Sequence, residues 1–140
     1  MPSKRELIVR AIMDALAPVA GVDGRIYRSQ ADPNPRELAP FISVQWTNEQ
    51  ANPDTVQLLG RILTVEVSVY TRDDIPDMAA DDILVSAHQL IMANPSLGGL
   101  ALDIVLDDAN AEIIAADFPA AKVTHNYSVK FRHSYGDMTT

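Results

Sequence analysis

The sequence predicts an α+β protein, in which a mostly antiparallel sheet of four to five strands carries two main helices on one face. Two stretches have apolar residues at helical spacing, several runs alternate apolar and polar residues, and two helices are too few to cover both faces of a parallel sheet. The chain has 140 residues, of which 47% are hydrophobic. This supply of apolar residues is sufficient for one core, so residues 1–140 are expected to form a single domain.

The two helices are predicted from their caps and apolar stripes. Ser3, followed three residues later by a glutamate, is a capping-box pattern that starts the first helix, and Pro18 ends it. The second helix should begin near Asp77, after several possible aspartate N-caps, and end at Asn94-Pro95. Each stretch is apolar along one side only, so both helices should lie on the sheet.

The strands are predicted from the alternation of apolar and polar side chains. They are expected at residues 25–29, 41–47, 60–72, 101–107 and 123–132. The proline-containing stretch before Phe41 is interpreted as a loop. Residues 112–116 are too few and too rich in alanine to assign.

Residues 48–59 are predicted to form a long exposed hairpin loop, because they contain Asn-Pro-Asp and no clear periodicity. Apolar residues in an exposed loop either need a partner or fold back on their own sheet, and both alternatives stay open. On the first alternative, the loop contacts a neighbouring subunit. Its candidate interface residues are Gln50, Asn52, Asp54, Val56, Leu58 and Leu59. Arg25 and Arg28 are interpreted as further interface or rim cations rather than as a nucleic-acid patch.

The negative charge is concentrated in one block. The formal net charge is −8, and residues 73–117 contain ten acidic residues and no Lys or Arg. The candidate surface consists of Asp73, Asp74, Asp77, Asp81, Asp82, Asp107 and Asp108. Helix caps, turns and a solvated helix face are one explanation. The other is a single acidic surface that lets DNA slide past without binding it.

Sites for chemistry are few. Cys is absent, which excludes thiol nucleophiles, disulfides and zinc ribbons. His125 and His133 lie about 26 Å apart in one predicted strand and cannot share a metal. His88 is interpreted as a semi-buried structural histidine, because it has no His or carboxylate four residues away. Calcium-loop and phosphate-loop spacings are missing, although weak divalent binding and a carboxylate pair stay open. We expect no enzyme activity, catalytic residue, cofactor or metal site.

Composition also bears on location. A pI near 4.6 argues against duplex DNA or an anionic membrane surface as the main ligand. No apolar run approaches the roughly 20 residues that cross a bilayer. The charged residues Lys4, Arg5, Glu6 and Arg10 interrupt the first apolar stretch, which argues against a signal peptide and for the cytosol.

Five segments in their order along the chain resemble the tail-terminator proteins that cap the tail tube of long-tailed bacteriophages, the lambda-type minor tail protein family. They are residues 5–16, 25–28, 38–44, 60–70 and 94–104. The resemblance implies a structural virion protein of the tail, assembled in the host cytoplasm. Six copies would form a ring on the last ring of the tail tube, end its polymerisation and provide the surface that joins the head. The implied partners are other copies of the chain, the tail tube protein, the head–tail connector protein and DNA that passes through the lumen without specific binding.

The resemblance leaves alternatives within and beyond phage tails. A head–tail connector, neck or tail-completion protein has similar size and composition. A small hydrolase or a protein adaptor is a weaker alternative, since a hydrolase would gather His88 or the acidic residues around an apolar cavity.

Overall fold

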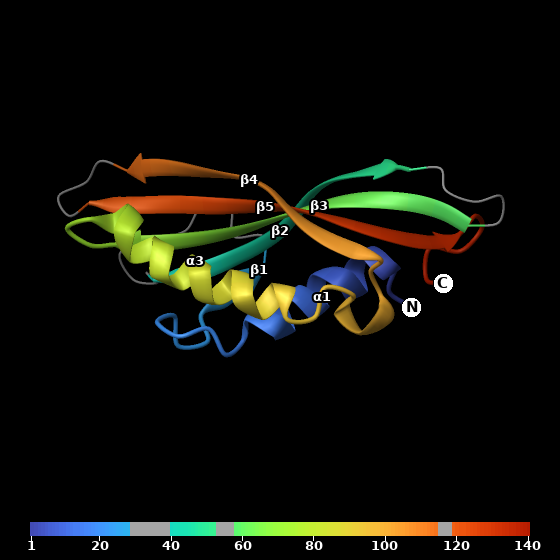
Figure 1. Ribbon diagram of the computed structural model, residues 1–140, viewed down its shortest axis with the longest axis horizontal. Coiled ribbons are helices and arrows are strands. Elements are labelled where there is room, and N and C mark those ends of the chain that lie inside the picture. Colours follow the sequence, from blue (N-terminus) through green and yellow to red (C-terminus); the bar gives the residue numbers. More distant parts are fainter. Residues whose placement is uncertain (29–39, 53–57, 115–118) are drawn as a thin grey trace.

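The computed structural model describes residues 1–28, 40–52, 58–114 and 119–140, and it shows one layer of helices against one sheet (Figure 1). The elements in chain order are α1 (Lys4–Leu16), β1 (Ile26–Arg28), β2 (Phe41–Ala51), β3 (Leu58–Arg72), α3 (Pro76–Met92), a short 3₁₀ helix (Leu97–Gly99), β4 (Asp103–Ile114) and β5 (Ala120–Ser134).

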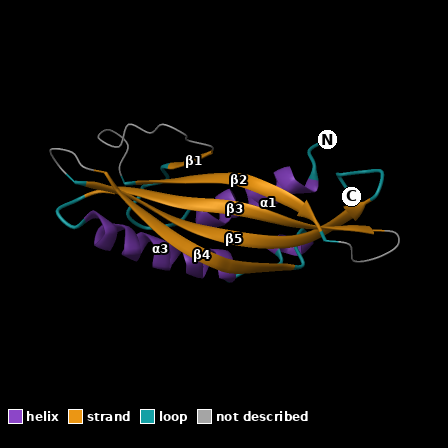
Figure 2. Cartoon of the chain, turned by 90° about the horizontal axis from the view of Figure 1, so that it is seen from above, coloured by secondary structure: helices purple, strands orange, loops and turns teal. Residues whose placement is uncertain are grey.

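The sheet has five strands in the order β1-β2-β3-β5-β4. β1 pairs with β2 in parallel, and the other three pairs are antiparallel. The predicted α+β fold class is therefore confirmed, with a sheet that is mixed because of β1. The last strand of the chain lies inside the sheet, between β3 and β4 (Figure 2).

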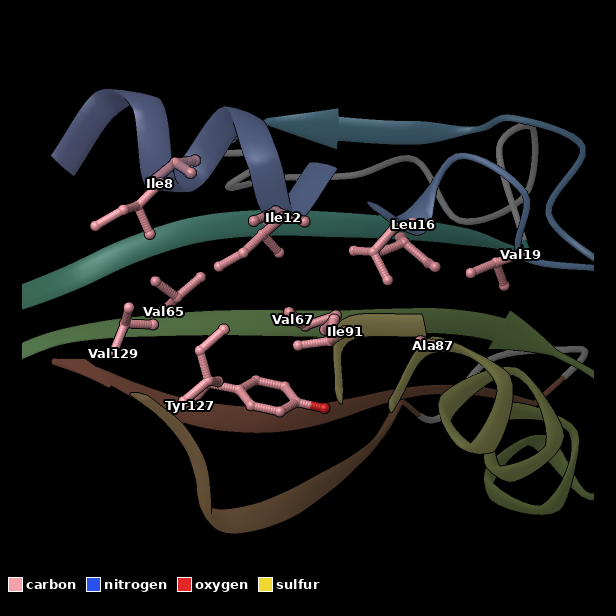
Figure 3. Packing of buried hydrophobic residues seen from close by; sticks show 14 of the residues in the cluster. Ile8, Ile12, Leu16, Val19, Val65, Val67, Ala87, Ile91, Tyr127 and Val129 are labelled. Carbon is pink, nitrogen blue, oxygen red and sulfur yellow. The ribbon is translucent and has the colours of Figure 1, made fainter. Parts of the chain in front are cut away.

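Helices α1 and α3 lie on the same face of the sheet, which we call the helix face (Figures 1 and 2). Ile8, Ile12 and Leu16 of α1 and Ile91 of α3 point toward the strands and are at most 1% exposed (Figure 3). They meet the side chains at every second position of the central strands. These strand residues are Leu63, Val65, Val67 and Val69 of β3 and Tyr127, Val129 and Phe131 of β5. Burial of these side chains is the main force that holds the two layers together.

The two helices are capped differently at their N-termini. The Ser3 hydroxyl accepts a hydrogen bond from the Glu6 backbone N–H at 3.2 Å, as the capping pattern predicts. α3 begins at Pro76, one residue from the predicted start, and its N-cap is Ile75 with no side-chain cap. None of the aspartates expected as caps takes that role, because Pro76 already fixes the backbone of the first turn.

The predicted loop over residues 48–59 is wrong at both ends. β2 continues to Ala51 and β3 begins at Leu58, so only Asn52 and the undescribed residues 53–57 separate the two strands. The alternation breaks because the register of β2 shifts between Trp46 and Asn48, which leaves Thr47 as an extra residue. A second register shift, between Leu106 and Asp108, breaks the alternation of β4 in the same way. The sequence pattern therefore gave no strand for the second half of β4, which includes the unassigned residues 112–114.

Candidate functional site

The face of the sheet opposite the helices, which we call the open face, is organised in cross-strand rows. The strand register aligns Asp103 of β4 with Lys130 of β5, Ile62 of β3 and Gln50 of β2. Two rows further along, Asp108 aligns with Asn126, Glu66 and Gln45. Each of these rows therefore has a carboxylate at its β4 end and a side-chain amide at its β2 end.

The sheet has two edges that no described strand covers. Among the described strands, β4 pairs only with β5, and β1 pairs only with Ile42–Val44 of β2. Residues 45–51 of β2 thus have a described strand on one side only. Both edges expose apolar side chains: Trp46 of β2 is 39% exposed, and Val105 and Ile113 of β4 are 44% and 60% exposed. Such edges are templates for pairing with another strand.

The residues predicted to form an interface loop do not lie together in one exposed loop. Gln50 is exposed on β2, whereas the Asn52 N–H donates a hydrogen bond to the Gly60 carbonyl at 2.7 Å and continues the β2–β3 pairing. Leu58 and Leu59 are half-buried residues of β3, so they do not form an exposed loop. Asp54 and Val56 lie outside the described residues.

The predicted interface cations Arg25 and Arg28 have partners within the chain. The Arg28 guanidinium donates to both carboxylate oxygens of Glu6, at 2.7 Å from its Nη2 to Oε1, and thereby ties β1 to α1. Arg25 Nε donates to the Pro40 carbonyl at 2.9 Å and Arg25 forms an ion pair with Asp23 at 3.5 Å. The sequence spacing gave no sign of the Glu6 pair, because 22 residues separate its members.

The predicted acidic surface divides into two groups, one in the helix layer and one on the open face of the sheet. The first group lies at the beginning of α3 and the second on β4, and Figure 2 places α3 alongside β4. All seven predicted residues are exposed: Asp73, Asp74, Asp77, Asp81, Asp82, Asp107 and Asp108. Asp107 accepts a hydrogen bond from Ser128, and Asp108 accepts one from Asn126 at 2.5 Å, so both are fixed against β5. We call these seven residues together the acidic flank.

His88, His125 and Tyr127 form a cluster between α3 and the sheet. His88 Nδ1 lies 2.9 Å from the Tyr127 hydroxyl oxygen, and the two imidazole rings are 6.4 Å apart. Burial and the proximity of His88 lower the pKa of His125, against the opposing effect of Asp81. Burial also raises the pKa of Tyr127 to about 12. His88 is thus half-buried as expected, and its partner is a neutral phenol rather than a catalytic carboxylate.

A cavity lies elsewhere in the described structure, at the beginning of α3. It has a volume of about 450 Å³ and its lining includes Gly21, Ile75, Met78, Asp82 and Ile83. Asp73 and Asp82 of the acidic flank line it, whereas none of the three histidines does. A hydrolase-like arrangement of His88 around an apolar cavity is therefore not found.

Within the described residues, no group of three or more His, Asp or Glu side chains is arranged to hold a metal ion. Neither α1 nor α3 has the length and apolar character needed to cross a membrane.

Comparison with known proteins identifies a similar fold. No protein-family model matches the chain, and no curated protein matches it either. A chain from the virion of a native gene transfer agent (GTA) particle is similar in structure, with a TM-score of 0.52 over 90% of this chain and 95% of that chain. The two share a fold. The sequences are 14% identical.

Proposed function

We propose that this chain is a structural protein of a phage-like virion, and that it acts as a tail terminator. In this role, six copies form a ring on the last ring of the tail tube, end tube polymerisation and provide the surface that joins the head. The fold similarity to a chain of the GTA virion supports the general role, because it extends over nearly the whole length of both chains.

The two edges of the sheet support a subunit of an assembly. No described strand covers either edge, and the two edges differ in chemistry, which suits the unlike contacts of a closed ring.

The acidic flank supports a passage for DNA. The Asp107 and Asp108 carboxylates accept hydrogen bonds from Ser128 and Asn126 on the open face and repel phosphate, so a ring with the open face toward its lumen would let DNA pass without binding. Asp107 and Asp108 are held against β5 by hydrogen bonds and would keep their position as DNA moves.

Negative-stain imaging of the purified protein, alone and mixed with tail tubes, tests the proposal. The expected result is a six-membered ring, and rings bound at one end of tubes whose growth has stopped. Tube protein polymerised without the chain is the control, and its tubes should be longer and of variable length. A protein that neither forms rings nor binds tube ends would refute the proposal. Rings that bind a head–tail connector but no tube would favour the connector or completion role.

A further inference from the structure

The edge strands β2 and β4 run in the directions that an antiparallel junction between neighbouring copies needs. β2 is antiparallel to β3, β3 to β5, and β5 to β4, so β2 and β4 run in opposite directions. Copies related by a rotation about an axis roughly along the strands keep their strand directions. β4 of one copy and β2 of the next would then meet as antiparallel strands, the more stable of the two pairings.

We propose that β4 of one subunit pairs with residues 45–51 of β2 in the next subunit, so that the sheet continues from copy to copy. The inference rests on the proposed function, because it names the junction between neighbouring subunits of that ring. The described β2 edge offers seven residues, about 20 Å of strand, and the cross-strand rows place its residues 45–50 level with residues 103–108 of β4.

Side-chain chemistry on the open face matches across this junction. At the level of residues 45–51, β4 presents Asp103 and Asp108, whose carboxylates only accept hydrogen bonds when ionised. β2 presents the exposed amides of Asn48 and Gln50, which can donate. A row of acceptors on one edge therefore faces donors on the other.

The single acid of the β2 edge is already neutralised. The Glu49 side chain is 7% exposed and accepts from Arg61 Nη2 at 2.6 Å, with Arg5 at 3.5 Å. Arg5 also lies 4.4 Å above the Trp46 ring and holds that exposed side chain at the edge. The β2 edge thus carries no unpaired carboxylate that would repel β4.

The bends of the two edges also lie at the same level of the sheet. The register shift in β2 follows Trp46, and the register shift in β4 follows Leu106. Trp46 and Leu106 are the two ends of one cross-strand row, through Val65 and Tyr127. Since a bulge bends its strand and increases the local twist, both edges bend around the same row and can remain adjacent along their length.

Pairing of two β4 edges is the main competitor, and charge disfavours it. A two-fold junction would bring the exposed carboxylates of both copies together, including Asp107 and Asp108. Like charges directly opposite each other on adjacent strands are destabilising. The acids on β4 therefore select against a closed dimer and leave the β2 edge as the compatible partner.

The test uses one variant for each edge. Asn48→Asp with Gln50→Glu places carboxylates on β2 opposite those of β4. Val105→Lys places a charge at a 44% exposed position of β4 in the same row as Asn48, where the neighbouring strand would bury it. In each variant alone, the dissociation constant for self-association should rise by about tenfold or more, so that the protein is mainly monomeric in sedimentation and light-scattering measurements. High salt should partly restore the first variant.

Mixing the two variants gives the decisive result. Each retains one intact edge, so an equimolar mixture should form one-to-one dimers and nothing larger. The matched controls are Gln89→Glu with Asn94→Asp and Val85→Lys, which make the same changes at exposed positions in α3 and just after it. Both controls should assemble as the wild type does.

The outcomes separate this junction from the proposed function. Rings that persist in either edge variant, a mixture without dimers, or a wild type that stays monomeric would overturn the junction. If the edge variants still form rings and these rings still cap tubes, the junction is wrong but the tail-terminator role is supported. Conversely, dimers in the mixture together with wild-type rings that never bind tubes would support the junction and refute the function.

Discussion

Replacing Glu6 with Gln removes the charge at the centre of the contact between α1 and β1. The Glu6 carboxylate accepts from Arg28 and also from Arg10 Nε at 2.9 Å. The hydrogen bonds from Arg28, with a smaller contribution from Arg10, lower the pKa of Glu6 from 4.5 to about 2. The contact therefore stabilises the folded chain only while Glu6 is ionised.

The size of the effect follows from the pKa and the exposure. At about 1.4 kcal/mol for each pH unit, the full shift corresponds to about 3 kcal/mol. The Glu6 side chain is 27% exposed and the two arginines are 33% and 59% exposed. Solvent and salt screen such pairs, so we expect Glu6→Gln to lower the free energy of unfolding by about 1 to 1.5 kcal/mol at pH 7.

The sign of the pH dependence is determined by the direction of the shift. Because the pKa of Glu6 is lower in the folded chain, its stabilisation is present above about pH 4.5 and is lost as the pH falls toward about 2. Urea unfolding of wild type and Glu6→Gln, followed by circular dichroism at pH 7, 5, 4 and 3, should show a difference that shrinks with acidity. Asp14→Asn, an exposed carboxylate on the same helix, is the control and should change stability by less than about 0.5 kcal/mol. A difference between wild type and Glu6→Gln that is constant from pH 7 to pH 3 would refute the electrostatic explanation.

Three further predictions concern the core, the open face and the histidine cluster. Ile12→Ala should lower the free energy of unfolding by about 2 to 5 kcal/mol, measured by urea denaturation, because this side chain is 1% exposed in the core. Ser68→Ala should cost about 1 to 3 kcal/mol in the same assay, because it leaves the buried Thr124 hydroxyl, 2.8 Å away, without its partner, and a Ser68→Ala, Thr124→Val double variant should recover part of that loss. Since burial lowers the pKa of His125, the wild type should lose stability as the pH falls below about 6.5, and the melting temperature of His125→Gln should change less between pH 8 and 5. Equal slopes for the two proteins would contradict this.

Local patterns were sufficient for much of the fold. Ser3 identified the beginning of α1, and the strict alternation of β3 identified a strand that is buried on its helix face. The patterns failed where a bulge shifts the period of two, at Thr47 and Asp107, because one extra residue moves every later side chain to the opposite face. The parallel pairing of β1 could not be read from its three residues.

The candidate site depended more on contacts between distant residues. Arg28 was expected at an interface, yet its guanidinium is held by Glu6 on a different element. Glu49 is charged and lies near the end of β2, but Arg5 and Arg61 cover it. Ion pairs of this kind have no local periodicity, so composition alone does not identify which charges remain available to a partner. Exposure of Gln50 was predicted correctly, although it lies on a strand and not in a loop.

The position of β5 within the sheet has a consequence for synthesis. β5 follows both of its neighbours in the chain, and it must insert between β3 and β4 to complete their pairing. Until the ribosome has released residues 120–134, β4 has no described neighbour to hold it. A chain that lacks residues 120–134 therefore lacks one of the two surfaces through which copies would join, so association with other copies has to wait until this strand has left the ribosome.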